Sequence, residues 1–180
     1  MPYLFRAAEP RDLDAVTDIY NAAVLEGGST ADLAARTPQQ RRAWLESHHP
    51  PYGVFVVERD GNDETGNGGR GTTSDADRVV AFGALSVYYD RAGYDGVVDL
   101  AYYVAPEARG GGAGRFLLER LLDEARARGM RQAIGIVFAD NAASGALLES
   151  HGFTRFGLLP QAATDAVGRM HDMAYWRLAL

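Results

Sequence analysis

The chain has 180 residues and a formal net charge of −6, and 47% of its residues are hydrophobic. This length suits one domain, and the apolar content is too high for a disordered chain. The absence of Cys excludes disulfides, thiolate catalysis and cysteine-based zinc sites. All 18 basic residues are Arg, so the chain has neither a Schiff-base lysine nor the lysine of an ATP-binding P-loop.

The charge pattern and the N-terminus bear on partners and location. The sequence has no basic stripe of the kind that nucleic-acid-binding proteins carry. The N-terminal segment is charged at Arg6 and lacks the apolar run of a signal peptide, and no stretch approaches the ~20 apolar residues that span a bilayer. We therefore expect one cytoplasmic domain, residues 1–180, that binds neither nucleic acid nor a membrane.

Apolar spacing and cap residues predict five elements in the N-terminal half. In chain order these are a strand over 3–7, a helix from Pro10 to Gly27, a helix from Thr37 to about His48, a strand over 52–58 and a strand over 79–89. Between the last two strands, residues 60–77 are rich in Gly and Asp and contain no aromatic side chain. We expect an extended, mobile loop there rather than a linker between domains.

The C-terminal half alternates strands and helices. Its predicted elements are a strand over 97–104, an amphipathic helix that ends at Gly129, a strand over 132–138, a helix over 142–150, and strands over 153–158 and 170–178. The resulting order, βααβββαβαββ, joins a meander of strands to a later β–α–β crossover. This order predicts an α+β (mixed α/β) fold and not a doubly wound sheet.

One segment carries most of the chemical information: a strand, a short turn, and then Arg109-Gly-Gly-Gly-Ala-Gly114 at the head of an amphipathic helix. Backbone N–H groups can reach a ligand directly where side chains are absent, and a helix N-terminus favours an anion such as phosphate. Arg109 adds a planar guanidinium suited to the same oxygens. The residues of the predicted phosphate-binding turn are Arg109, Gly110, Gly111, Gly112, Ala113, Gly114 and Arg115.

The glycine spacing discriminates among phosphate-binding motifs. The dinucleotide fingerprint G-x-G-x-x-G fails because residue 115 is Arg, and the ATP loop fails because there is no Lys. The pattern that fits is R-x-x-G-x-G, with Arg109, Gly112 and Gly114 at its fixed positions. Here the sequence resembles the GNAT acetyltransferase superfamily, whose members hold the pyrophosphate of acetyl-CoA with this turn.

The resemblance covers nearly the whole chain and narrows to the phosphinothricin and methionine sulfoximine N-acetyltransferases. Four segments match that group's motifs in order: Arg6-Ala-Ala…Asp12…Ile19-Tyr20-Asn21, Asp99…Tyr103-Val104…Pro106…Arg109…Gly114, Asn141…Ser144…Leu147-Leu148-Glu149…Gly152-Phe153, and His171-Asp172-Met173…Trp176. The resemblance implies a GNAT fold, with a mixed, mostly antiparallel sheet of about seven strands flanked by four helices.

It also implies acetyl-CoA as co-substrate, no metal, a homodimer, and direct transfer to the amine of a small amino-acid-like substrate such as phosphinothricin or methionine sulfoximine. Because an ammonium has no lone pair, the amine must lose a proton to a base, and the resemblance puts Asp99 in that role. The cofactor contacts that it implies, besides the turn, are Tyr102, Tyr103, Val104, Asn141 and Ser144. The acceptor contacts that it implies are Leu33, Arg91, Tyr94 and His171.

Three positions depart from the family pattern. Asp99 replaces a glutamate, Leu148 replaces a histidine and cannot carry a proton, and Leu33 replaces an aromatic residue. Burial of Asp99 would raise its pKa from ~3.9 and make it a better base at neutral pH, whereas pairing with an arginine such as Arg91 would make it structural. No residue is assigned as the acid for the departing thiolate.

Two other functions are consistent with the same residues. The first is acetylation of a protein N-terminus, such as that of a ribosomal protein, which needs an open groove instead of a closed pocket. The second is a CoA-binding regulatory module without catalysis, which the loss of the motif histidine at Leu148 allows. Asn141 could serve as the N-cap of its helix as well as a cofactor contact.

Overall fold

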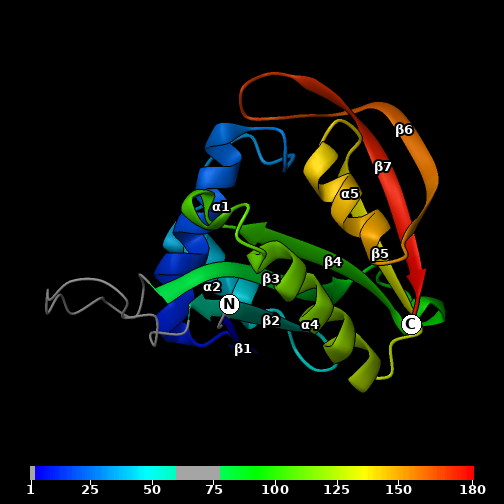
Figure 1. Cartoon of the computed structure of the whole chain (residues 1–180), viewed down its shortest axis with the longest axis horizontal. Coiled ribbons are helices and arrows are strands. Elements are labelled where there is room, and N and C mark those ends of the chain that lie inside the picture. The colour runs from blue at the N-terminus through cyan, green and yellow to red at the C-terminus, as the bar shows by residue number, and fades with distance from the viewer. Residues whose placement is uncertain (1–2, 60–77) are drawn as a thin grey trace, which may run out of the picture.

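A seven-stranded sheet in the order β1-β2-β3-β4-β5-β7-β6 forms the centre of the molecule (Figure 1). Neighbouring strands are antiparallel except β4 and β5, which are parallel. The computed structural model describes residues 3–59 and 78–180, so the loop predicted at 60–77 lies outside the described residues. Within them, the predicted α+β fold, a mostly antiparallel seven-stranded sheet with four α-helices, is confirmed.

The elements follow the predicted order. The strands are β1 (Tyr3–Ala7), β2 (Gly53–Arg59), β3 (Val79–Val87), β4 (Val97–Val104), β5 (Gln132–Phe138), β6 (Thr154–Thr164) and β7 (Met170–Ala179). The α-helices are α1 (Leu13–Glu26), α2 (Pro38–Glu46), α4 (Ala113–Ala127) and α5 (Ala142–Ser150). Short 3-10 turns cover Pro10–Asp12, Ala92–Tyr94 and Pro106–Ala108.

The largest boundary error is in β6, which was predicted to end at residue 158 and continues to Thr164. The added part pairs with β7 after a register shift between Leu159 and Ala163, where Gln161 has a φ of 48°. β6 is an edge strand, so the missing N–H of Pro160 costs little there. The helix after Thr37 is also shorter than predicted and ends at Glu46.

Alternating side chains of β3 show which helices cover each face of the sheet. Phe82 packs edge-on against Trp44 of α2, with ring centroids 6.2 Å apart. The next residue, Gly83, faces Leu117 and Leu121 of α4. Because successive side chains of a strand point to opposite faces, α2 and α4 cover opposite sides. The leucines of α4 are fully buried, and each such side chain stabilises the fold by about 1.5–3 kcal/mol.

The parallel pair β4 and β5 is short. Pairing runs only from Val97–Gln132 to Leu100–Gly135. Beyond that point β4 continues to pair with β3 as far as Val104, while β5 continues to pair with β7. The two strands therefore diverge, and the edge of β4 from Ala101 to Val104 has no strand partner on the β5 side.

We predict that Gly83→Ala destabilises the protein by about 1–3 kcal/mol, because small-to-large changes in a packed core strain it. An added Cβ would lie 2.6 Å from a methyl of Leu121 and 2.8 Å from the carbonyl oxygen of Ala101. Gly93→Ala is the control, since a Cβ there meets nothing within 4 Å. Urea denaturation measures both free energies of unfolding, and equal values for the two variants would contradict the prediction.

Candidate active site

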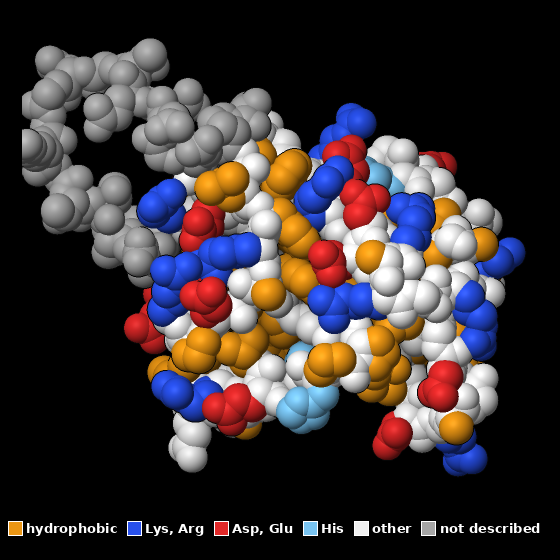
Figure 2. All heavy atoms as spheres, turned by 90° about the horizontal axis from the view of Figure 1, so that it is seen from below, with side chains coloured by type: hydrophobic (Ala, Val, Ile, Leu, Met, Phe, Trp, Pro, Cys, Tyr) orange, Lys and Arg blue, Asp and Glu red, His pale blue; other side chains and the backbone are white. Residues whose placement is uncertain are grey.

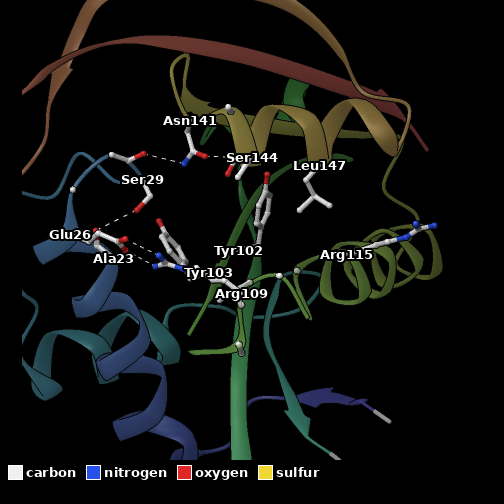
Figure 3. Close-up of a pocket in the computed structure, with 18 of the residues that line it drawn as sticks. Ala23, Glu26, Ser29, Tyr102, Tyr103, Arg109, Arg115, Asn141, Ser144 and Leu147 are labelled. Carbon is white, nitrogen blue, oxygen red and sulfur yellow. Dashed lines mark hydrogen bonds and ion pairs between the residues drawn. The ribbon is translucent and has the colours of Figure 1, made fainter. Parts of the chain in front are cut away.

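A cavity of about 630 Å³ opens where β4 and β5 diverge (Figure 3). Its walls come from the end of α1, the edge of β4, the turn into α4 and the first turn of α5. Of the residues predicted to bind the cofactor, those that line it are Tyr102, Tyr103, Val104, Arg109, Gly110, Gly112, Gly114, Arg115, Asn141 and Ser144. Gly111 and Ala113 do not line it: the Gly111 carbonyl accepts a hydrogen bond from Tyr3, and Ala113 is buried in the core.

The turn before α4 has the backbone geometry of an anion cradle. Gly110 and Gly112 have φ values of 73° and 87°, the left-handed region that glycine adopts without strain. A Cβ on either residue would meet nothing within 4 Å, so the backbone faces open space. Gly112 is the N-cap of α4 and provides no side-chain cap, which leaves N–H groups of the first helical turn for a ligand.

Arg109 lies at this cavity in an ion pair with Glu26 of α1. The two N–O distances are 2.9 and 2.7 Å, and both side chains are about half exposed. The Arg109 hydrogen bond lowers the pKa of Glu26, so the pair is ionised. A phosphate group that binds Arg109 must therefore compete with the Glu26 carboxylate. Sequence reasoning missed Glu26, although the Gly27-Gly28 stop signal places the end of α1 immediately after it.

Asn141 joins two walls of the cavity. Its Oδ1 accepts a hydrogen bond from the Ser144 N–H at 3.0 Å, which is the predicted N-cap of α5. Its Nδ2 donates to the carbonyl oxygen of Gly28, 3.1 Å away, in the loop after α1. Asn141 therefore holds the head of α5 against this loop while lining the cavity (Figure 3).

A smaller cavity of about 410 Å³ lies against the α2 side of the sheet. Tyr20, Asp32, Arg36, Gln40, Arg41, Trp44, Ala101 and Tyr103 line it. Tyr103 lines both cavities, so the two meet at this residue of β4. Asp99 shares the face of β4 with Ala101 and Tyr103, because residues two apart on a strand point the same way.

Asp99 is a largely buried carboxyl group that forms no ion pair among the described residues, and the backbone N–H of Leu100 is its one hydrogen-bonding neighbour in the electrostatics of the site. Its Oδ1 is buried and accepts no hydrogen bond from the described residues. Burial raises the pKa of Asp99 to about 7, as the sequence argument predicted for a buried strand position. The alternative partner, Arg91, stacks its guanidinium over Tyr89 at 5.8 Å and makes no ion pair with Asp99.

Ser86 lies directly opposite Asp99 on β3, and its hydroxyl is 2.9 Å from Nε2 of His48. The other ring nitrogen of His48 contacts the carbonyl oxygen of Trp44, so the Nδ1–H donates to that oxygen and Nε2 accepts from Ser86. Burial lowers the pKa of His48. The histidine beside Asp99 is therefore neutral at pH 7.

The predicted acceptor residues do not gather at either cavity. Leu33 is 66% exposed and Tyr94 is 44% exposed, and neither lines a cavity. Arg91 is exposed on the same loop as Tyr94. These positions depend on how loops fold over the sheet, which apolar spacing does not report.

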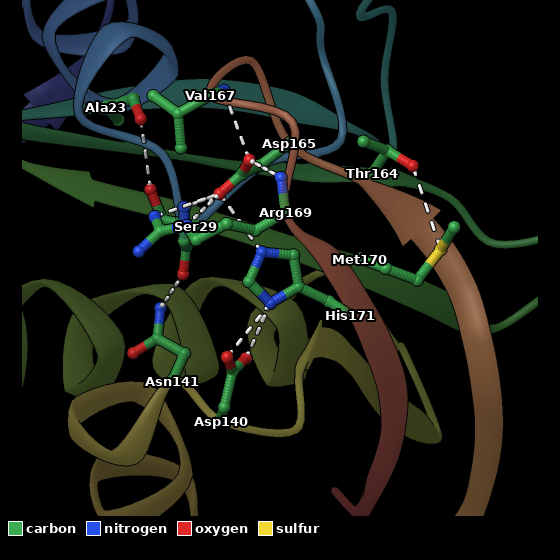
Figure 4. A network of polar contacts seen from close by, with 11 residues as sticks. Ala23, Ser29, Asp140, Asn141, Thr164, Asp165, Val167, Arg169, Met170 and His171 are labelled. Atoms are coloured by element: carbon green, nitrogen blue, oxygen red, sulfur yellow. Dashed lines mark hydrogen bonds and ion pairs between the residues drawn. The ribbon is translucent and has the colours of Figure 1, made fainter.

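His171 was also predicted to contact the acceptor, but both of its ring nitrogens bind carboxylates (Figure 4). Nδ1 is 2.9 Å from Asp140 and Nε2 is 3.0 Å from Asp165, and the side chain is 4% exposed. Burial opposes protonation of the imidazole, yet the two carboxylates outweigh it and raise the pKa of His171. The placement makes His171 structural.

Asp165 is the hub of this network. It accepts hydrogen bonds from the Gly28 N–H at 3.1 Å and from Arg169 Nε at 2.9 Å, in addition to His171. Burial opposes its ionisation, but these hydrogen bonds hold the pKa of Asp165 well below its usual range. The network ties the β6–β7 hairpin to the loop after α1, which forms one wall of the larger cavity.

Leu148, at the position of the family histidine, is fully buried and packs against Gly135. Residues 3–59 and 78–180 contain no group of three His, Asp or Glu side chains that could hold a metal ion. In the same residues, no helix is long and apolar enough to cross a bilayer. The face in Figure 2 carries basic and acidic side chains next to one another and no continuous basic stripe.

N–H groups without a side-chain cap at the head of a helix, beside two parallel strands that diverge, are suited to bind the phosphates of a nucleotide cofactor. A sequence profile described as the acetyltransferase (GNAT) family matches residues 13–153. The chain belongs to this family and is an acetyl-CoA-dependent N-acetyltransferase.

Relatives support the assignment along the whole chain. The L-methionine sulfoximine/L-methionine sulfone acetyltransferase of Salmonella typhimurium is 31% identical over 176 residues, which are 97% of this chain and 93% of the relative. A ribosomal-protein-alanine N-acetyltransferase from Brucella melitensis has a crystal structure that superposes with a TM-score of 0.85 at 32% identity, covering 98% and 99% of the two chains. A phosphinothricin acetyltransferase from Sinorhizobium meliloti in complex with acetyl-CoA gives 0.83 at 26% identity, covering 100% and 89%.

We predict that Gly112→Ala weakens acetyl-CoA binding about tenfold or more, or ~1.4 kcal/mol, because the added Cβ enters the open side of the cradle. Gly129→Ala is the matched control: it has a similar φ of 74°, also faces open space, and lies at the other end of α4. Calorimetric titration with acetyl-CoA measures both. Equal affinities in the two variants would show that the phosphates of acetyl-CoA do not bind at this turn.

Proposed function

We propose that this enzyme transfers the acetyl group of acetyl-CoA directly to the primary amine of a small amino-acid-like acceptor, such as phosphinothricin or methionine sulfoximine. The observation that carries the proposal is that Tyr103 lines both cavities, with Asp99, which lines neither, on the same face of β4 as Tyr103. That cavity is sized for a small molecule and is lined by charged and aromatic side chains. The named substrates of the relative from Salmonella typhimurium support the same class.

In the proposed mechanism, Asp99 is the general base. An acceptor amine arrives as an ammonium ion, and the carboxylate takes its proton directly or through one water molecule. A carboxyl group with a pKa of about 7 is half ionised at neutral pH and a far better proton acceptor than an exposed Asp. Neutral His48 and the Ser86 hydroxyl lie next to it and add no competing cation.

Acetyl-CoA supplies the activated thioester when it is bound. The edge of β4 near Val104 has backbone N–H groups that β5 does not cover, and these groups are donors for the oxygen that gains charge during attack. Tyr102 lines the same cavity with a buried hydroxyl that approaches Ser144 without reaching hydrogen-bonding geometry. Burial raises the pKa of Tyr102 to about 12, so the phenol stays protonated and can donate a hydrogen bond to the departing thiolate.

The Tyr102 phenol is too weak an acid to protonate the thiolate, so we propose that solvent delivers that proton. Leu148 cannot supply it. With no Cys in the chain, an acetyl-cysteine intermediate is impossible, which supports the proposal of direct transfer between the two bound substrates.

A second candidate is acetylation of a protein N-terminus, which the similarity to the ribosomal-protein-alanine N-acetyltransferase favours. Homodimer formation is a further proposal that rests on the family resemblance, and a cytoplasmic location is a further proposal that rests on the sequence. Exposed Phe156, Leu158 and Leu159 on the edge strand β6 offer an apolar surface for self-association.

Thiol release from acetyl-CoA across an amine panel tests the proposed function. We expect turnover with methionine sulfoximine, phosphinothricin or a related free amino acid, and kcat/KM at least about tenfold lower for a peptide with N-terminal Ala. Preference for the peptide would establish the second candidate. Saturable acetyl-CoA binding with no turnover on any amine would favour a regulatory module.

We predict that kcat/KM rises with pH through about 7, because Asp99 must be ionised to accept a proton. Asp99→Asn should lower kcat about 10²-fold or more and remove this rise, whereas Asp99→Glu, which keeps a carboxyl group, should retain most of the activity. Initial-rate assays from pH 5 to 9 measure kcat and kcat/KM for the native enzyme and for both variants. An unchanged profile in Asp99→Asn would assign the base to another residue.

The dependence of folding stability on pH gives Asp99→Asn a second measurable effect. The folded state holds the Asp99 proton up to about pH 7, and the unfolded state releases it near pH 4, so this group's contribution to stability falls as pH rises between those values. Asp99→Asn removes that loss. The Tm of the variant relative to the native protein should therefore be higher at pH 8 than at pH 4.

A further inference from the structure

Arg41 on α2 is a buried cation that forms no ion pair with the described residues, although Tyr20 and Asp32 interact with it electrostatically. Its side chain is 5% exposed, and its Nε is buried with no hydrogen-bond partner. The buried carboxylates behave differently: Asp12 pairs with Arg6, and Asp165 pairs with Arg169. No carboxylate of residues 3–59 or 78–180 forms an ion pair with Arg41. Burying an unpaired charge costs several kcal/mol, and an anion from outside the chain would recover part of that energy.

Aromatic rings hold the Arg41 guanidinium in place. Its carbon centre lies 3.8 Å from the centroid of the Tyr20 ring and 4.7 Å from that of Trp44. Such contacts stabilise a cation by about 0.5–2 kcal/mol, which offsets only part of the cost of burial. These contacts also fix the plane of the guanidinium group, so its N–H groups are preorganised to bind both oxygens of a planar carboxylate.

Asp32, the carboxylate that lines the same cavity as Arg41, already has other hydrogen-bond partners. Asp32 accepts hydrogen bonds from Arg36 Nε at 2.7 Å and from the Tyr20 hydroxyl at 2.5 Å. The hydrogen bond from Arg36 is the main reason that the pKa of Asp32 is lowered, so this ion pair is neutral overall. The lining of the smaller cavity therefore carries one uncompensated positive charge, at Arg41.

We propose that Arg41 binds the α-carboxylate of the acceptor and thereby selects free amino acids over peptide N-termini. The inference rests on the proposed function and names the part of the substrate that this cavity recognises. Ala101 lines the cavity and lies two residues from Asp99 on one face of β4, about 7 Å along the strand. An α-amino acid carries its carboxylate and amine on one carbon, so a carboxylate on Arg41 holds the amine in the smaller cavity. Asp99 does not line that cavity, and the proposed route of the proton from the amine to Asp99 runs through a water molecule.

A peptide lacks this group. Its first residue has an amide where a free amino acid has a carboxylate, and an amide leaves the guanidinium without its counter-ion. The same argument predicts rejection of amino-acid carboxamides, which keep the amine and the side chain and lose only the charge. Buried polar groups left unpaired are a strong source of substrate discrimination.

The test compares Arg41→Met with Arg42→Met, since Arg42 is the exposed neighbour on the same helix. For methionine sulfone and its carboxamide, we expect the native enzyme to prefer the acid in kcat/KM by about 10-fold or more. Arg41→Met should raise KM for the acid about tenfold or more, abolish the preference, and leave KM for acetyl-CoA within about twofold. Arg42→Met should match the native enzyme in all three values.

A binding measurement without acetyl-CoA keeps the test independent of turnover. Calorimetry should detect methionine sulfone binding to the native protein and to Arg42→Met, and binding at least tenfold weaker to Arg41→Met. Removal of an unpaired buried charge should leave the Tm of Arg41→Met equal or higher, which separates lost binding from lost folding. Binding that depends on Arg41 but is not followed by turnover would refute the proposed function and leave the role of Arg41 in binding intact. Equal binding by all three proteins, no binding to the native protein, or equal use of acid and carboxamide would overturn the role of Arg41.

Discussion

The divergence of β4 from β5 is the constraint on which the site depends. Hydrogen bonding between them stops at the Leu100–Gly135 pair, because β4 remains paired with β3 while β5 remains paired with β7. A continuous sheet would use the edge of β4 for strand pairing. Here that edge is available to a ligand, and Tyr103 connects the cavity beside the glycine turn with the cavity beneath α2.

The buried ionisable groups of this molecule are of two kinds, those with an ion-pair partner and those without one. In the network of Asp165, His171 and Asp140, each buried charge has a partner, and the result is a tie between the β6–β7 hairpin and the loop after α1. Asp99 and Arg41 differ from this network, because each has one buried polar atom, Oδ1 and Nε respectively, without a hydrogen-bond partner among the described residues. A paired group is satisfied within the fold, whereas an unpaired buried group is costly until a partner binds it.

Two of the three departures from the family pattern, at Asp99 and Leu148, fall on ionisable positions of that pattern, and none falls in the glycine turn. The glycine turn, its left-handed φ values and the Asn141 cap all survive. Leu148 instead fills space against Gly135 where the family has an ionisable ring. In the proposed mechanism, the Asp99 carboxylate reaches one methylene less far than a glutamate, which favours a bridging water molecule between the carboxylate and the amine.

The sequence alone determined the elements and the cofactor turn. The bounds of β4, β5 and α5, the left-handed glycines and the cap at Asn141 follow from interactions within a few residues, which spacing and residue type report directly. Tertiary structure decided the rest. Arg91, Tyr94 and Leu33 lie outside both cavities, His171 contacts two carboxylates, and Arg41 forms no ion pair while Asp32 pairs with Arg36. Such outcomes depend on which distant segments meet across the sheet, and no local pattern encodes that.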